Sequence, residues 1–216
     1  MTADIIPFNP LDKKNLGASV AEAMLAGKVH PLGNLPEFKG AGIYAIYYAG
    51  DFAPYHEISK RNKDGKAGAP IYVGKAVPAG ARKGGGLASG GNGKPLFNRL
   101  SEHAESIRSV SNLNIEDFSC RFLVVDDIWI PLGESLIIAR YSPVWNSLID
   151  GFGNHDPGSG RYNGMRPRWD VLHPGRGWAA KCKERPESPN DIARDVEVYL
   201  GNATFPTSDR FIVSED

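Results

Sequence analysis

The chain has 216 residues, of which 41% are apolar and 23% charged, and its 25 basic and 25 acidic side chains cancel. This composition supports a buried core and excludes disorder, and no run approaches the ~18 apolar residues of a membrane span. Two cysteines, Cys120 and Cys182, are too few for a disulfide framework or a cysteine-rich zinc site. The start lacks the basic-then-apolar pattern of a secretory signal, so the cytoplasm is the expected compartment.

The neutral total conceals a segregation of charge along the chain. Residues 57–97 hold eight basic and two acidic side chains, and residues 161–185 hold seven basic and two acidic ones. From residue 186 onward, two basic side chains face seven acidic ones. Two basic regions favour a polyanion as partner, although chance clustering on a solvated surface explains the pattern equally well.

Apolar periodicity and turn residues predict a succession of short elements. In chain order these are a helix at 16–29, strands at 42–49 and 71–74, a helix at 95–110, a strand at 118–125, helices at 132–141 and 188–200, and a short last strand at 210–214. The polar segment 50–70 is expected to be a loop, and seven glycines within 80–94 predict a flexible one. The order predicts an α/β (α+β) fold with one small sheet.

Two tyrosines and a cationic pair are the first candidates for chemistry. Tyr44 and Tyr72 lie on adjacent predicted strands, each within two residues of a glycine that would let a ligand approach closely. Arg99 and His103 are four residues apart and project from one helix face, where a bound anion would relieve their repulsion. Taken singly, each tyrosine is more typical of an apolar core, and the pair of a solvated surface.

Two more polar residues follow in the next helix and the turn after it. Glu134 falls in the first turn of a predicted helix, where the helix dipole favours a carboxylate, and it could equally be an oxygen ligand for Mg²⁺. Asn146 follows the helix stop at 141–143, a position typical of a turn residue. Only the complete set of six residues carries a functional hypothesis.

Four motifs hold these six residues in order: GIY at 42–44, YVG at 72–74, FNRLSEH at 97–103 and ESLIIARYSPVWN at 134–146. They resemble the successive motifs of the GIY-YIG nuclease superfamily, whose core is a small three-stranded antiparallel sheet flanked by helices. The chain departs from the compact pattern, because an insertion separates the tyrosine motifs, Val73 replaces isoleucine, and a glycine-rich segment precedes Arg99.

The resemblance also suggests a domain organisation. We expect a single domain over 1–216, with a nuclease core at 42–147 and a C-terminal extension at 148–216. Insertions at 50–70 and 76–95 interrupt the core, and DNA-binding insertions of this kind are typical of free-standing restriction endonucleases in the superfamily.

Chain length and the 134–146 segment resemble the type II restriction endonucleases that cut CCGCGG. This resemblance implies Mg²⁺-dependent, sequence-specific double-strand cleavage of DNA by a homodimer, in functional pairing with a cognate DNA methyltransferase. A nuclease for repair or mobile-element nicking and a non-catalytic DNA-binding domain remain alternatives, although the complete set of six residues argues against the latter.

The resemblance assigns a role to each of the six residues. Tyr44 is implied as the water-activating base, Tyr72 as the group that orients water or phosphate, and Arg99 as the phosphate clamp. His103 would lie near the base tyrosine, Glu134 would bind the metal, and Asn146 would organise hydrogen bonds. A single carboxylate is too few for a usual two-metal site, so we expect one Mg²⁺ per active site.

Reading a GC-only site calls for cationic side chains, because arginine bidentate to guanine is the common direct contact in the major groove. The candidates lie in the glycine-rich segment and after the core: Arg82, Lys83, Lys94, Arg161, Arg166, Arg168 and Arg176. A palindromic site implies a two-fold symmetric protein that presents one active site to each strand.

Overall fold

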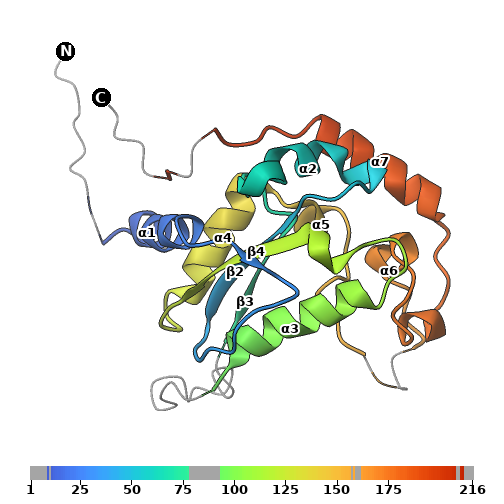
Figure 1. Ribbon diagram of the computed structural model, residues 1–216, viewed down its shortest axis with the longest axis horizontal. Helices are drawn as coiled ribbons and strands as arrows, with labels where there is room; N and C mark the ends of the chain where they lie inside the picture. The colour runs from blue at the N-terminus through green and yellow to red at the C-terminus, as the bar shows by residue number, and fades with distance from the viewer. Residues whose placement is uncertain are drawn as a thin grey trace.

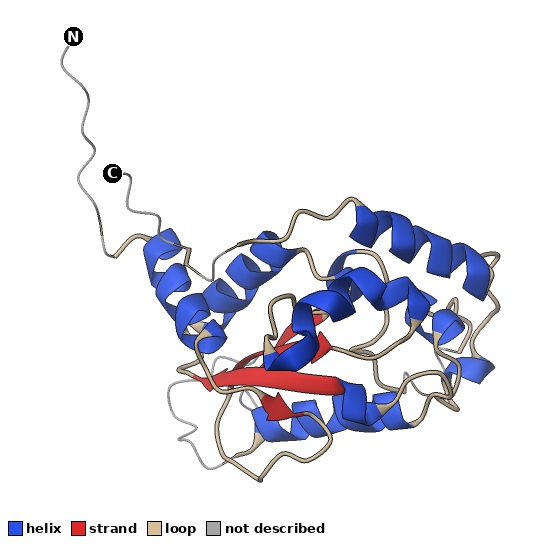
Figure 2. Cartoon of the chain, turned by 45° about the horizontal axis from the view of Figure 1, so that its top comes forward, coloured by secondary structure: helices blue, strands red, loops and turns tan. Residues whose placement is uncertain are grey.

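The computed structural model describes residues 9, 11–77, 93–156, 158, 162–207 and 210–211. An antiparallel sheet lies at its centre, with helices on both faces (Figures 1 and 2). In chain order its strands are β1 (His30–Pro31), β2 (Gly42–Tyr48), β3 (Tyr72–Ala76) and β4 (Phe118–Val124). Across the sheet they lie in the order β1-β4-β2-β3. The predicted α/β (α+β) class is therefore confirmed. The expected strand count of three was wrong, because the two-residue β1 is too short to show a periodic pattern.

Strand β2 is the centre of the sheet and is buried along its whole length. It pairs with β4 on one side and β3 on the other, and Tyr44 lies opposite Phe122 and Gly74. Because side chains alternate along a strand, Tyr44 and Ile46 face one layer, while Ile43 faces the other. This explains why the strand is apolar throughout rather than alternately polar.

Helices cover both faces of the sheet (Figure 1). They are α1 (Lys13–Leu25), α2 (His56–Asn62), α3 (Pro95–Arg108), α4 (Ile130–Tyr141), α5 (Val144–Ser147), α6 (Arg168–Leu172) and α7 (Pro189–Gly201), with 3₁₀ turns at Ala53–Tyr55, Lys63–Gly65, Ile115–Asp117 and Ala179–Lys181. Helices α1 and α4 pack on the face of Ile43, and α3 packs on the face of Tyr44. Within the described ranges, no helix combines the length and apolar character that a membrane crossing requires.

Residues 53–65 of the segment 50–70 form a helix with 3₁₀ turns at both ends, so the expectation of a loop there was wrong. Tyr55 and Ile58 bury their side chains completely, and the amide of Asn62 bonds to the backbone of Tyr48 and Ala69. The basic appearance of the segment in sequence therefore conceals an apolar face that docks on the sheet.

Helix α3 follows the predicted stripe closely. Pro95 occupies its first turn, where the missing N–H costs nothing, and Leu96, Leu100 and Ile107 are fully buried. The same stripe buries His103, so the helix delivers this polar ring into the core beside β2.

The C-terminal extension shares the core of the nuclease motifs. Trp169 of α6 and Ile192 and Val196 of α7 belong to the apolar cluster that contains Tyr44. A capping box between Ser188 and Asp191 begins α7. The extension is therefore an integral part of the fold.

Candidate active site

Tyr44 and His103 form the centre of the candidate site. The phenol Oη of Tyr44 lies 2.6 Å from Nε2 of His103, and both residues are 1% exposed. The phenol lies close above β3, because a Cβ atom on Gly74 would come within 2.5 Å of Tyr44 Oη. The glycine of the second motif is therefore the residue that makes room for the tyrosine of the first.

Tyr72 and Arg99 line the same site on its outer side. The ring of Tyr72 lies 6.2 Å from that of Tyr44 and 5.3 Å from that of His103, measured between centroids. Arg99 is one turn before His103 on α3, and its side chain is 21% exposed. An open pocket of about 370 Å³ adjoins Arg99 and His103, and the exposed part of the Arg99 side chain can meet a ligand there.

A segment that the sequence analysis missed closes the site from the C-terminal extension. The ring of Phe152 stacks on His103 at 4.5 Å and 15°, and the carbonyl of Gly153 accepts a hydrogen bond from Arg99 Nη2 at 2.6 Å. The imidazole Nε2 of His155 lies 2.5 Å from Arg99 Nη1. The GFG sequence at 151–153 marks a turn, but nothing in it indicates the distant partners on α3.

Burial controls the protonation of the central pair. It raises the pKa of the Tyr44 phenol well above its usual range, and the neighbouring Tyr72 raises this pKa further, whereas Arg99 lowers it. Burial also lowers the pKa of His103 well below its usual range, and the charge of Arg99 lowers it further. Near neutral pH the pair thus consists of a phenol and a neutral imidazole.

Glu134 reaches the site from α4, on the other face of the sheet. Its side chain is 16% exposed, and Oε2 accepts a hydrogen bond from Lys75 Nζ at 2.6 Å. It is close enough to the tyrosines for its negative charge to raise the pKa of both Tyr44 and Tyr72. Lys75 directly follows the YVG motif, and its pairing with Glu134 was not foreseen from the sequence.

The donor set around Glu134 fits a hard divalent cation only in part. In the parts of the chain that the structure describes, no three acidic, histidine or cysteine side chains gather to hold an ion by themselves. Mg²⁺ commonly uses one or two carboxylates and completes its shell with water and substrate phosphate. One accessible carboxylate therefore fits a Mg²⁺ ion that is held jointly with a substrate.

Asn146 lies behind the site and holds the free edge of β3. Its Oδ1 accepts from the N–H of Val73 and its Nδ2 donates to the carbonyl of Val73, both at 2.8 Å. Both polar groups of the side chain are thus engaged with the backbone between Tyr72 and Gly74. The residue positions this strand and directs no polar atom to the pocket.

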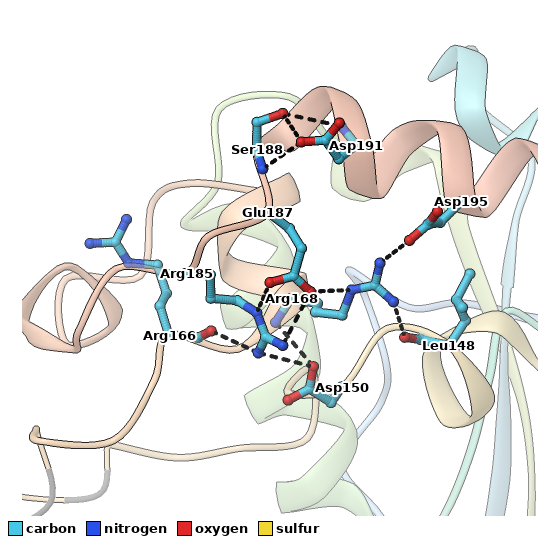
Figure 3. A network of polar contacts seen from close by, with 9 residues as sticks. All are labelled: Leu148, Asp150, Arg166, Arg168, Arg185, Glu187, Ser188, Asp191 and Asp195. Carbon is cyan, nitrogen blue, oxygen red and sulfur yellow. Dashed lines mark hydrogen bonds and ion pairs between the residues drawn. The ribbon is translucent and has the colours of Figure 1, made fainter.

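Several candidates for DNA reading are already engaged elsewhere. Lys94 pairs with Glu37 at 2.5 Å, and Arg166 donates to the carbonyls of Ala179 and Ala180. Figure 3 shows the guanidinium of Arg168 between α7 and the carbonyl of Leu148, where Glu187 and Asp195 are its acidic partners. Arg82, Lys83 and Arg161 lie outside the described residues.

Arg176 is the candidate that the structure removes from the DNA-reading set. Its side chain is 4% exposed and pairs with the equally buried Asp170, with 2.5 Å between Nη2 and Oδ2. A guanidinium enclosed in this way cannot reach a base edge. The assignment of Arg176 to DNA reading, made from a run of basic residues, is therefore corrected.

Comparison with known proteins agrees with this geometry. Residues 36–200 match the family model described as the Eco29kI GIY-YIG domain. No curated protein matches the chain. The matched range runs from before β2 to the end of α7 and contains all six residues of the motifs. Since the match covers well over half of the chain, the chain belongs to the Eco29kI family of GIY-YIG restriction endonucleases.

Proposed function

We propose that this chain is a type II restriction endonuclease that cuts double-stranded DNA by hydrolysis with one Mg²⁺ per active site. The observation that carries the proposal is that Tyr44, Tyr72, Arg99 and His103 gather at one site, where Arg99 and His103 line an open pocket and Glu134 is within electrostatic reach. A phenol and a neutral imidazole in contact provide a route for a proton, and a guanidinium beside them provides a place for a phosphate.

In the proposed reaction, Tyr44 takes a proton from the attacking water and passes its own proton to Nε2 of His103. The water oxygen bonds to phosphorus, the bond from phosphorus to the leaving oxygen breaks, and the leaving oxygen takes a proton from solvent. A bound Mg²⁺ would supply positive charge that stabilises the scissile phosphate. Arg99 binds the phosphate oxygens, and Tyr72 orients the water or the phosphate from the other side. A positioned base of this kind contributes about 10²–10⁴-fold to the rate.

Lys75 and Asn146 support this machinery in different ways. Lys75 neutralises Glu134 while no cation is bound, and it must release Oε2 for the carboxylate to serve as a metal ligand. Asn146 keeps β3 straight at Val73, so that Tyr72 and Gly74 stay in register with β2.

We further propose the palindrome CCGCGG as the recognition site, read by a homodimer with one active site per strand. The cations proposed to read it are Arg82, Lys83 and Arg161, while Lys94, Arg166 and Arg168 would exchange their present partners for DNA. A cognate DNA methyltransferase would protect the host sequence. Binding should weaken steeply as salt rises, because phosphate contacts release counterions.

A plasmid digest tests the proposal directly. DNA with mapped CCGCGG sites is incubated with and without Mg²⁺, using the wild-type protein, Tyr44→Phe, and Tyr199→Phe as a matched control. Tyr199 donates to the carbonyl of Ser142 on the exposed side of α7, far from the pocket. We expect discrete double-strand fragments only with Mg²⁺, cleavage about 10³-fold slower with Tyr44→Phe, and full cleavage by Tyr199→Phe.

Other outcomes of the digest would identify the alternatives. Nicks or cuts that depend on DNA structure would indicate a repair or mobile-element nuclease, and binding without any cleavage would indicate a non-catalytic domain. Resistance of DNA that is methylated at the site supports the pairing with a methyltransferase, and sedimentation of the DNA complex measures the number of protomers.

A further inference from the structure

The guanidinium of Arg176 is the most heavily bonded polar group in the C-terminal extension. It donates to the carbonyls of Gly151, Phe152 and Asn154 at 2.8, 3.1 and 3.1 Å. Two further bonds, of 2.6 and 2.5 Å, join its Nε and Nη2 to the carboxylate of Asp170. One buried side chain is thus hydrogen-bonded to three backbone carbonyls within residues 151–154.

Two aromatic rings fix the guanidinium on its flat faces. Its Cζ lies 4.5 Å from the ring centroid of Trp169 and 4.7 Å from that of Trp178. Such cation–π contacts favour a charge that is withdrawn from water. A buried ion pair contributes little to stability compared with an apolar replacement, so stability alone does not account for this arrangement.

The backbone that Arg176 holds is the one that touches the active site. The carbonyls of Phe152 and Asn154 bond to Arg176, whereas the carbonyl between them, on Gly153, accepts from Arg99. In the same segment, the ring of Phe152 stacks on His103. Gly153 also lies against Tyr72, because a Cβ there would come within 2.8 Å of the phenol Oη.

We propose that Arg176, held by Asp170, is a positioning residue for the nuclease reaction. It fixes residues 151–154 so that the Gly153 carbonyl sets the direction of Arg99 and the Phe152 ring holds His103 beside Tyr44. The role rests on the proposed function. It also means that the reactive geometry depends on the extension as well as on the motifs of the core.

The test compares Arg176→Lys with a matched control, Arg121→Lys. Lysine keeps the charge opposite Asp170, but its three N–H donors cannot replace the five bonds that Arg176 makes to the carboxylate and three carbonyls. Arg121 is a partly buried arginine that donates to the carbonyl of Ala67 and lies 5.5 Å above the ring of Tyr47, on the other face of the sheet. Both variants are assayed at a temperature where circular dichroism shows them folded.

We expect Arg176→Lys to lower the single-turnover cleavage rate at saturating DNA by about 10²-fold, because small misplacements of a clamp have effects of this size. The dissociation constant for DNA should stay within about 3-fold of the wild type, since most contacts to DNA remain. Arg121→Lys should change neither quantity. An equal rate for the two variants would overturn the inference.

A double-mutant cycle separates positioning from a general loss of rigidity. In an Arg99→Lys background, Arg176→Lys should cause less than its own loss, because part of its effect passes through Arg99. If the rate losses of Arg99→Lys and Arg176→Lys multiply in the double variant, the two residues act independently, and this would contradict the proposal.

The histidine NMR spectrum of the DNA-free protein decides the inference even if the chain cleaves no DNA. The ring current of Phe152 acts on His103, so Arg176→Lys should move the His103 ring signals and Arg121→Lys should leave them in place. His103→Gln assigns the signals by their loss. Moved signals without cleavage would refute only the proposed function, whereas unmoved signals in Arg176→Lys would refute the positioning role.

Discussion

Two buried tyrosine–histidine pairs in this molecule, Tyr44–His103 and Tyr55–His173, have the same contact. In each, the phenol Oη lies 2.6 Å from the imidazole Nε2. The first pair lies between β2 and α3 beside an open pocket, while the second lies inside the core. All four side chains are at most 1% exposed, so burial of the pair itself does not distinguish them.

The difference lies in what surrounds each pair. The indole of Trp145 donates to Tyr55 Oη at 2.8 Å, and Oδ1 of Asn112 lies 2.9 Å from Nδ1 of His173, so this pair is closed by hydrogen bonds at both ends. Arg99 and Glu134 instead place charges near Tyr44. A short tyrosine–histidine bond is therefore no sign of catalysis by itself, and the first pair differs from the second in its nearby charges and adjoining pocket.

The largest expected effect comes from removing the two phenol oxygens in turn. Tyr44→Phe should lower cleavage by about 10³-fold, because it removes the proposed base. Tyr55→Phe should change the rate only a few-fold but lower the free energy of unfolding by about 1–3 kcal/mol, because Trp145 and His173 lose a buried partner. Single-turnover cleavage measures the rates, and urea unfolding measures the free energies of unfolding. Equal rate losses in Tyr44→Phe and Tyr55→Phe would remove the distinction between the pairs.

The charge that distinguishes the first pair can be removed without touching either ring. Glu134→Gln should lower cleavage by about 10²-fold and raise the Mg²⁺ concentration needed for half-maximal rate, since an amide is a weaker ligand. Glu57→Gln, which removes an exposed partner of Lys60, is the control and should change neither the cleavage rate nor its Mg²⁺ dependence. Full cleavage with unchanged Mg²⁺ dependence in Glu134→Gln would exclude Glu134 as the ligand.

A smaller effect is expected from crowding the Tyr44 phenol. The Cβ of Gly74→Ala would come within 2.5 Å of Tyr44 Oη, so the ring must shift, and we expect about 10-fold slower cleavage. Gly201→Ala at the end of α7 meets no atom within 4 Å and should cleave like the wild type. Gly74→Ala with wild-type kinetics would show that the contact between the ring and β3 is unimportant.

The mildest prediction concerns the closed pair and acid. Burial lowers the pKa of His173 to about 3, whereas an unfolded histidine has a pKa of about 6.5, so the unfolded chain binds the proton first as pH falls. This contribution to stability is full above about pH 6.5 and is lost toward pH 3, by up to about 1.4 kcal/mol per pH unit. The free energy of unfolding, measured with urea across this range, should change less steeply with pH in His173→Gln than in the wild type. An unchanged slope would mean that His173 is not held neutral.

Sequence patterns predict the parts of this fold whose signals are local. The stripe of α3 and the apolar run of β2 have strong periods, and both elements formed within a few residues of the predicted bounds. The segment 50–70 was misjudged, because its apolar face depends on two buried side chains, Tyr55 and Ile58, among many polar ones. Short amphipathic helices of this kind give little periodic signal.

The site was predictable only as far as the motifs reach. The motif residues identify Tyr44 and Arg99, but the Phe152–His103 stack and the bond from Arg99 to Gly153 join positions about fifty residues apart. Arg176 shows the limit most clearly, because a run of basic residues does not reveal that one of them is enclosed by two tryptophans. Such long-range partners have no sequence period.

The amide of Asn146 has a consequence for how protomers can assemble. By occupying both the N–H and the carbonyl of Val73, it takes the place of a neighbouring strand at the outer edge of β3. A second copy therefore cannot extend the sheet at this point, and aggregation by edge-to-edge pairing is blocked there as well. Contacts between two copies that run through the β3 edge at Val73 would have to use side chains, because the backbone groups there are already bonded.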